Sequence, residues 1–338
     1  MNRRAKPNST ALDPSRQWPY RQCFASALLV SASLTAFHAA AYPTKPLRFV
    51  VPYPPGGPVD ITARIVGPEL SQRLGQPVVI DNRGGAGGIL GSDVVAKSVP
   101  DGHTLLLGTV SNAINPSVVP KLPFDASRDF TPVTMLVVIT SILAVHPGLQ
   151  ATSVQSLLAM AKAKPGALRY ASTGNGTPGH LAAELFKVMG GVDILHVPYK
   201  GAAPALVDVM NGQVHIVLLS APGLLPHVQS GRLRALAVTN AQRSSLLPEL
   251  PTIAESGLPG FEAEGWHGVF VPSATPGTTV AILNRALLDV LTRDDVRKRL
   301  MQGGAEPVGL PTTQFVAKFK AEMERWARVV KSAGIKAD

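Results

Sequence analysis

Serine and histidine side chains are the first residues in this sequence that could support catalysis. They form no nucleophile–base pattern, because the chain has no GxSxG segment and no fixed Ser–His spacing. We therefore predict hydrogen-bonding or structural roles for most of them, and no enzymatic activity. An exported hydrolase that uses a loop serine stays open as the alternative function. The residues concerned are Ser111, Ser172, Ser220, His180, His196, His215 and His267.

Metal and thiol chemistry find little support in the sequence. The histidines show no HExxH or paired spacing. The one cysteine, Cys23, lies in the N-terminal region. A lone thiol forms neither an intrachain disulfide nor a cysteine metal site. The sequence therefore predicts no metal ion.

A turn near the start of the chain is the first candidate for ligand binding. A β-rich run over residues 47–51 leads to Pro54-Pro55-Gly56-Gly57, and a helical pattern follows with Asp60 in its first turn. A strand, a glycine turn and a helix N-terminus together present backbone N–H groups to an anion. Asp60 can also cap the helix. Taken alone, the same residues fit an ordinary turn between a strand and a helix.

A second glycine-rich turn, Gly174-Asn175-Gly176-Thr177-Pro178-Gly179, matches GxGxxG after a strand and before a helix. A dinucleotide site also needs an acidic residue at the end of the next strand. That strand ends at Val197-Pro198-Tyr199 and carries none. We therefore predict no cofactor, and a small-anion site at this helix start instead.

Further polar side chains follow predicted strands, where ligands bind in open parallel sheets. They can donate hydrogen bonds to a carboxylate or cap the helices that follow, and the sequence leaves both roles open. Tyr199 could form a wall of a ligand cleft or pack inside its lobe. The remaining members of this set are Ser111, Asn112, Ser172, Thr173 and Thr177.

The elements that would position these residues form two similar α/β patterns. Residues 47–108 alternate β-α-β-α-β and residues 168–219 repeat the alternation, which is typical of a mostly parallel sheet flanked by helices. Extended segments over residues 135–145 and 266–271 bracket the second pattern. Three helical stretches then close the chain. The simplest topology has two lobes joined by two crossovers, with a ligand in the cleft between them.

These patterns divide the chain into four parts. We assign residues 1–41 to a signal peptide, 42–140 to lobe 1, 141–265 to lobe 2, and 266–338 to a return crossover and C-terminal helices that complete lobe 1. The signal assignment rests on an apolar segment after a basic head and on the small residues before Tyr42. An uncleaved membrane anchor is the alternative. We therefore expect export to the periplasm.

The net charge gives a poor case for nucleic-acid binding. The chain of 338 residues carries a formal charge of +10. Without residues 1–41 it has 27 basic and 21 acidic residues, a charge of +6. No dense Lys/Arg run with interleaved aromatic residues occurs. The mild excess suits a small acidic ligand.

Short motifs in a fixed order give the chain a resemblance to a known family. They are Tyr42-Pro43-Thr44-Lys45-Pro46, Pro52-Tyr53-Pro54-Pro55-Gly56-Gly57, Asp81-Asn82-Arg83-Gly84-Gly85-Ala86-Gly87-Gly88, Pro100-Asp101-Gly102, Ala113-Ile114-Asn115-Pro116, Tyr170-Ala171-Ser172, His196-Val197-Pro198-Tyr199-Lys200-Gly201 and Leu233-Arg234-Ala235-Leu236-Ala237-Val238-Thr239. With them, residues from about 42 onward resemble the tripartite tricarboxylate transporter solute receptors, the Bug-type periplasmic binding proteins. The resemblance implies a Venus-flytrap receptor that closes on a small organic acid. Its partners would be membrane transporter subunits or a sensor domain, and we expect a monomer.

The resemblance also implies which residues contact the ligand. Family members typically grip a carboxylate with loop N–H groups and hydroxyls from both lobes. By position, these would be Pro55, Gly56, Gly57, Asp60, Ser111 and Asn112 in lobe 1, and Ser172, Thr173, Asn175, Gly176, Thr177 and His180 in lobe 2, to which we add Tyr199 and Ser220.

One departure from the family pattern concerns specificity. Many members carry an acidic residue where this chain has Leu219, followed by Ser220. An apolar side chain there cannot pair with an ammonium group. We therefore hypothesise that free amino acids are disfavoured against plain carboxylates or aromatic acids.

Overall fold

The computed structural model describes residues 1–2 and 42–335. Apart from its first two residues, the predicted signal peptide lies outside this described part. Residues Pro43–Asp338 belong to one compact unit. Within the described residues, no helix combines the length and the apolar character needed to cross a membrane.

The strands of this unit form a six-stranded and a five-stranded sheet. The six-stranded sheet and the helices packed on it are called lobe 1 below, and the five-stranded sheet with its helices is called lobe 2. In sheet order, the strands of lobe 1 are β11 (Ala305–Leu310), β4 (Phe130–Ile139), β10 (Gly265–Pro272), β3 (Thr104–Thr109), β1 (Leu47–Val51) and β2 (Val78–Asn82). Those of lobe 2 are β7 (Leu195–Pro198), β6 (Arg169–Ser172), β8 (Ile216–Ser220), β5 (Ser141–Val145) and β9 (Arg234–Val238).

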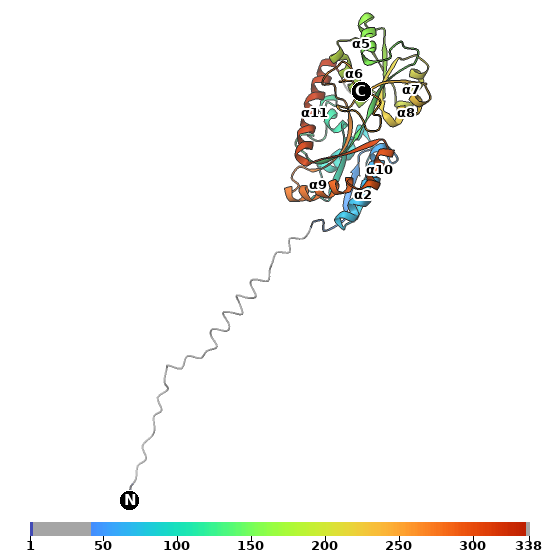
Figure 1. Cartoon of the computed structure of the whole chain (residues 1–338). Coiled ribbons are helices and arrows are strands. Elements are labelled where there is room, and N and C mark those ends of the chain that lie inside the picture. Colours follow the sequence, from blue (N-terminus) through green and yellow to red (C-terminus); the bar gives the residue numbers. More distant parts are fainter. Residues whose placement is uncertain (3–41, 336–338) are drawn as a thin grey trace. The chain divides into compact units, whose positions relative to one another are not determined.

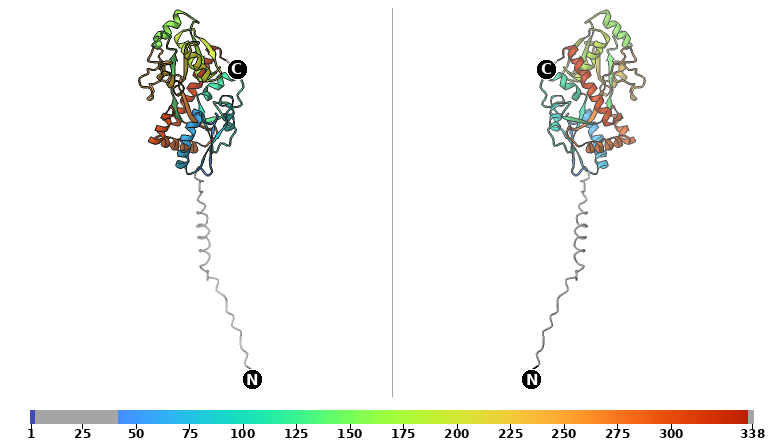
Figure 2. Two further views of the ribbon diagram at one scale, coloured as in Figure 1. Left: turned by 90° about the vertical axis from the view of Figure 1, so that its right-hand side faces the viewer. Right: turned by 90° about the vertical axis from the view of Figure 1, so that its left-hand side faces the viewer.

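The helices cover these two sheets. They are α2 (Pro58–Leu74), the short 3-10 turn η1 (Ala86–Gly88), α3 (Ile89–Ala96), α4 (Ser111–Val118), α5 (Val154–Ala163), α6 (Pro178–Gly190), α7 (Ala202–Met210), α8 (Ala221–Gln229), α9 (Gly277–Leu291), α10 (Asp294–Gln302) and α11 (Thr312–Ala333). Figure 2 shows the blue helix α2 together with the orange helices α9 and α10 at one end of the unit, where they contact one another.

The pairing of the strands confirms the two-lobed α/β fold. In lobe 1, β1 pairs in parallel with β2 and β3, and in lobe 2, β6 pairs in parallel with β7 and β8. These are the strands that the βα patterns predict. The strands β10 and β5 run antiparallel to both of their neighbours. Each sheet is therefore more mixed than the expected mostly parallel arrangement.

The apolar segment over residues 135–145 is two strands and not one. Thr140 separates β4, which pairs in lobe 1, from β5, which pairs in lobe 2. The chain returns to lobe 1 with β10, which begins at Gly265. The lobes are thus joined at Thr140 and by the loop-rich residues that follow β9.

A partly buried polar cluster ties these connections together. The Glu306 carboxylate on β11 accepts hydrogen bonds from the hydroxyls of Thr140, Ser244 and Ser245 and from the Ser245 N–H. Thr140 and Ser244 are buried. Burial opposes ionisation of Glu306, but these hydrogen bonds outweigh it and hold the pKa of the carboxyl below its usual value. Glu306 therefore links lobe 1 to two segments that lead into and out of lobe 2.

The C-terminal helix packs on lobe 1 and also on lobe 2. Figure 1 shows α11 along one side of the unit, beside α6 of lobe 2, and it also contacts α4 and β4 of lobe 1. One face of α11 is core packing, with Phe315, Phe319 and Trp326 all buried. One hydrophobic cluster accordingly runs through both lobes.

Three elements were not predicted: α4, α8 and β11. Each contains proline, at Pro116, at Pro222 and Pro226, and at Pro307. Proline lowers helix and strand propensity, so the local pattern indicated loops. The Ser111–Asn112 segment, which follows a predicted strand, is the first turn of the helix α4.

Candidate functional site

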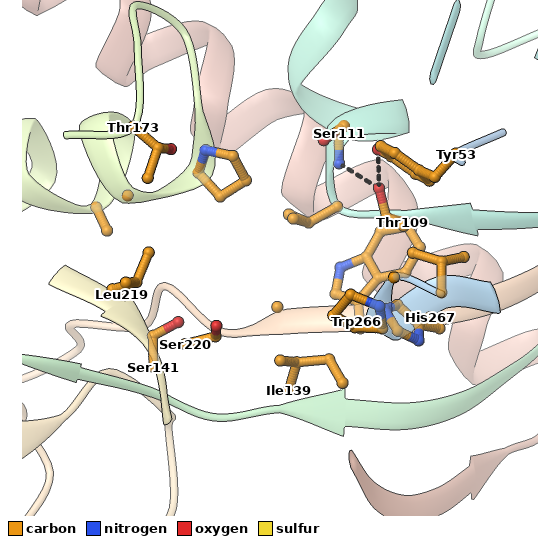
Figure 3. A pocket seen from close by; sticks show the side chains of 18 of the residues that line it. Tyr53, Thr109, Ser111, Ile139, Ser141, Thr173, Leu219, Ser220, Trp266 and His267 are labelled. Carbon is orange, nitrogen blue, oxygen red and sulfur yellow. Dashed lines mark hydrogen bonds between the residues drawn. The ribbon is translucent and has the colours of Figure 1, made fainter. Parts of the chain in front are cut away.

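A pocket of about 560 Å³ lies between the lobes. Figure 3 shows Thr173, Leu219 and Ser220 of lobe 2 across from Thr109, Ser111 and Trp266 of lobe 1. Its walls come from the N-termini of α2 and α6, the junction of β3 with α4, the first residues of β10 and the end of β8. The pocket therefore lies where the strand ends and helix starts of both lobes meet, as expected for open α/β sheets.

The loop before α2 forms part of the lobe 1 wall. Helix α2 begins with Pro58, and Gly57 is its extended N-cap. Both line the pocket, together with Pro55 and Val59. The N–H groups of the first helical turn have no acceptor within the helix, so Val59 and the N-cap offer backbone donors on this side.

Asp60 supports this loop from behind. Its side chain is 2% exposed and accepts hydrogen bonds from Gly56 N–H, Asn82 Nδ2 and Arg64 Nε at 2.8–2.9 Å. Burial opposes its ionisation, but these bonds outweigh it and hold the pKa of Asp60 below the usual value. Asp60 therefore fixes the turn as an anion and does not line the pocket.

The β3–α4 junction presents hydroxyl groups to the pocket. The Tyr53 hydroxyl lies 3.1 Å from Thr109 Oγ1, which also accepts a hydrogen bond from Ser111 N–H (Figure 3). Asn112 is used internally: its Oδ1 accepts from Thr109 N–H and its Nδ2 donates to Ser92 Oγ, both at 2.9 Å. Ser111 therefore faces the pocket, whereas Asn112 fastens the junction to α3.

The α6 N-terminus forms the opposite wall. Thr173, Pro178 and Gly179 line the pocket, and Pro178 is the first helical residue. Behind them, Thr177 Oγ1 donates to Gly174 O at 2.7 Å, and Gly176 N–H donates to His180 Nδ1 at 3.0 Å. This turn is thus the counterpart of the α2 turn. In both turns the helix begins with an exposed proline, and polar side chains form hydrogen bonds that fix the loop.

The geometry brings one serine–histidine pair together. Ser172 Oγ lies 2.7 Å from His196 Nε2, a distance typical of a nucleophile and its base. However, Ser172 is 2% exposed and lies outside the pocket lining. His196 stacks on the rings of Tyr170 and His180, and burial lowers its pKa to about 4. This pair therefore braces the α6 turn and offers no accessible nucleophile.

The start of β10 contributes two residues that the sequence analysis did not assign to the site. Trp266 and His267 both line the pocket. Thr62 Oγ1 of α2 lies 2.9 Å from His267 Nδ1, and burial lowers the pKa of His267 to about 4, so the imidazole is neutral at neutral pH. The available signal was their position at the start of the predicted extended segment over residues 266–271, where the chain passes back from lobe 2 to lobe 1.

The electrostatic character of the pocket is neutral. Among the described residues that line it, none is Asp, Glu, Lys or Arg. Its polar groups are the hydroxyls of Ser, Thr and Tyr, the ring nitrogens of Trp266 and His267, and backbone N–H groups. In the described part of the chain, no group of three or more His, Cys, Asp or Glu residues could hold a metal ion. Such a site can bind an anion through hydrogen bonds and the positive ends of helix dipoles.

Five of the predicted ligand residues line the pocket, namely Pro55, Gly57, Ser111, Thr173 and Ser220. The others lie outside its lining: Gly56, Asp60, Asn112, Ser172, Asn175, Gly176, Thr177, His180 and Tyr199. Tyr199 donates to Asp208 at 2.6 Å within lobe 2, and the pKa of its hydroxyl is raised to about 12 by burial and by that carboxylate. Ligand contact by any of these residues stays a prediction.

Two α/β lobes around an interlobe pocket define a two-lobed solute-binding protein. The family model described as tripartite tricarboxylate transporter family receptor matches residues 62–335. The chain belongs to this family, which confirms the resemblance drawn from the motifs. Members are periplasmic solute receptors.

Individual relatives agree with this assignment. Protein BugT of Bordetella pertussis is 39% identical over 300 residues, which cover 88% of this chain and 92% of BugT. The R. palustris protein Rpa4515, solved with adipate, is 39% identical with a TM-score of 0.73, covering 88% of this chain and 100% of that one. MatC (Rpa3494) from Rhodopseudomonas palustris, solved with bound malate, is 32% identical with a TM-score of 0.69. The match covers 86% of this chain and 100% of MatC.

Proposed function

We propose that this protein captures a small organic carboxylate in the interlobe pocket and presents it to a tripartite tricarboxylate-type transporter or to a sensor. The observation that carries the proposal is the pair of prolyl helix starts, at Pro58 and Pro178, that line one pocket from opposite lobes. The structures of two relatives with adipate and with malate support an acid as the ligand class.

Closure supplies the physical mechanism. Each helix start carries a partial positive charge and free N–H groups. A carboxylate that contacts both is held more tightly when the lobes are together, so the acid stabilises the closed state by its differential affinity. The neutral pocket adds hydroxyl donors from Ser111, Thr173 and Ser220.

The proposed location is the periplasm, reached through a cleavable signal peptide over residues 1–41. The support for it is the family, whose members are periplasmic receptors, and the basic head, apolar segment and small residues of the N-terminal sequence. The proposed partners are transporter subunits in the membrane or a sensor domain, and the proposed state is a monomer.

Mass spectrometry of ligand retained by gently purified protein, followed by a thermal-shift panel of carboxylates, tests the proposal. Only the folded state binds the acid, so Tm should rise with the acid concentration. A protein that retains no acid and whose Tm is unaffected by every carboxylate would contradict the function. Loss of growth on the identified acid after deletion of the gene would separate transport from a role in sensing alone.

An exported hydrolase is the competing function. Ser111 and Ser220 both line the pocket. Within the described contacts, neither is hydrogen-bonded to a histidine, which a nucleophilic serine requires. We propose that the chain is not an enzyme, and turnover of ester substrates by the purified protein would overturn this.

A further inference from the structure

The indole of Trp266 occupies an unusual position, with one side in the core and its nitrogen at the pocket. Its ring is nearly perpendicular to the rings of Phe315 and Phe319, with centroids 5.4 and 6.1 Å away, and the Phe270 centroid lies 6.2 Å away. Gly268 allows this packing, because a Cβ at that position would overlap the Phe315 ring. The indole is therefore fixed in orientation before any ligand arrives.

The indole nitrogen has no hydrogen-bond partner among the described residues, although Trp266 is 1% exposed. Figure 3 shows the ring nitrogen turned towards the middle of the pocket. An indole N–H is a donor only, and a buried donor without an acceptor is costly. A group that enters the pocket can therefore supply the missing acceptor.

Trp326 provides a built-in comparison. It is as deeply buried, at 2% exposed, but its Nε1 donates to Glu322 Oε2 at 2.7 Å. The fold thus supplies an acceptor for one buried indole and leaves the other directed at the pocket. This contrast points to a ligand group opposite Trp266.

The surroundings of Trp266 indicate what that ligand looks like. Ile139, Leu218 and Leu219 form apolar walls between the two ends of the pocket, with Val59 and Val110 beside the α2 and α4 starts. Apolar walls favour an apolar body, since a polar middle would lose its hydrogen bonds to water there. The hydrogen-bond donors lie at the helix starts, at Trp266 and at the hydroxyls of Tyr53 and Ser141.

Resting on the proposed function, we infer that Trp266 Nε1–H donates a hydrogen bond to a second oxygen acceptor of the bound acid. The pocket then takes acids with an apolar body and an oxygen acceptor separate from the carboxylate held at the helix starts. It rejects acids that lack this acceptor, because a site built to donate a hydrogen bond loses it with such an analogue.

Matched acid pairs test this by calorimetry: succinate with butanoate, adipate with hexanoate, suberate with octanoate, and terephthalate with benzoate. For the pair that binds, the diacid should bind at least about tenfold more tightly than the monoacid, the effect of one hydrogen bond to a charged group. Trp266→Phe should remove most of this preference, with little change for the monoacid. Equal affinities within every pair, or an equal loss for both members in the variant, would overturn the inference.

A second measurement uses the protein with Trp266 in place, so that the inference can be tested even if Trp266→Phe does not fold. In ¹⁵N-labelled protein the indole N–H resonance of Trp266 should shift on binding of the diacid, and that of Trp326 should stay in place. The mature chain has two tryptophans, Trp266 and Trp326, because Trp18 lies in the predicted signal peptide, so Trp326→Phe alone assigns both resonances. Binding without a selective shift of Trp266 would overturn the inference and leave the proposed function standing, whereas no binding by any acid would overturn both.

Discussion

Glu306→Ala tests whether one carboxylate fastens the hinge between the lobes. The substitution removes the acceptor for the hydroxyls of Thr140, Ser244 and Ser245, and for one backbone N–H. Thr140 and Ser244 are 0% and 2% exposed, so their hydroxyls would lose a charged acceptor without full access to water.

The expected cost follows from these two buried hydroxyls. A hydrogen bond to a charged group contributes about 1.5–3 kcal/mol, and partial solvation of Glu306 reduces this, so we expect the free energy of unfolding to fall by about 2–4 kcal/mol at neutral pH. Ser245 is exposed and adds little. Glu324→Ala, an exposed position on α11, serves as the matched control and should change stability by less than about 0.5 kcal/mol.

The pH dependence gives a second, independent readout. The pKa of Glu306 in the folded protein is lowered from 4.5, because its hydrogen bonds outweigh the effect of burial. Its contribution is therefore complete above pH 4.5 and is lost as the pH falls through the lowered value. Urea unfolding should show a large difference between wild type and Glu306→Ala at about pH 7 that shrinks below about pH 4. A difference under about 1 kcal/mol at neutral pH, or one that grows in acid, would refute the reasoning.

Three further predictions concern the interlobe contact, the ligand and pH. Gly176→Ala should weaken binding of the acid about tenfold, because the new Cβ would lie 2.7 Å from Val118 of the facing lobe. Gly191→Ala is the control, since Gly191 has a similar positive φ but open space around it, and this variant should leave the binding isotherm unchanged. Equal losses of affinity in the two variants would assign the effect to backbone strain instead. Succinate should bind more tightly than aspartate in calorimetry, since Leu219 offers no charge to an ammonium group, and a preference for aspartate would sink this idea. The free energy of unfolding should fall as the pH drops from 6.5 to about 4, because His267 is protonated at a lower pH in the folded protein than in the unfolded chain. His267→Gln should flatten this part of the plot of unfolding free energy against pH, and an unchanged slope would contradict the assignment.

The βα units were predictable because their signals are local. Runs such as residues 47–51 and 104–109 are mostly apolar, with a proline directly after the first and a glycine near the end of the second. The break at Thr140 had no such signal: the residues on both sides are β-formers, and only their pairing with different sheets separates them. Strand β11 was missed for a related reason, since Pro307 and Gly309 weaken its pattern and only pairing with β4 specifies it.

The site was predictable in outline and less so in its residues. The two glycine turns indicated the helix starts, and Gly57 and Thr173 line the pocket. Asp60 and His180 occupy the same turns, but their side chains are directed to backbone groups of the loops, which a sequence pattern cannot distinguish from ligand contact. Trp266 was missed because an apolar aromatic residue in a strand is most often core, and here it is both core and pocket wall.

The position of β10 has a consequence for the order in which the protein folds. This strand lies between β3 and β4, although all of the five-stranded sheet separates it from both of them in the chain. The central strand of the lobe 1 sheet is therefore missing until residues 265–272 pair with β3 and β4. Every strand of lobe 2, by contrast, lies within residues 141–238. We expect lobe 2 to gain protection from hydrogen exchange first during refolding, with lobe 1 and its pocket wall closing last around β10.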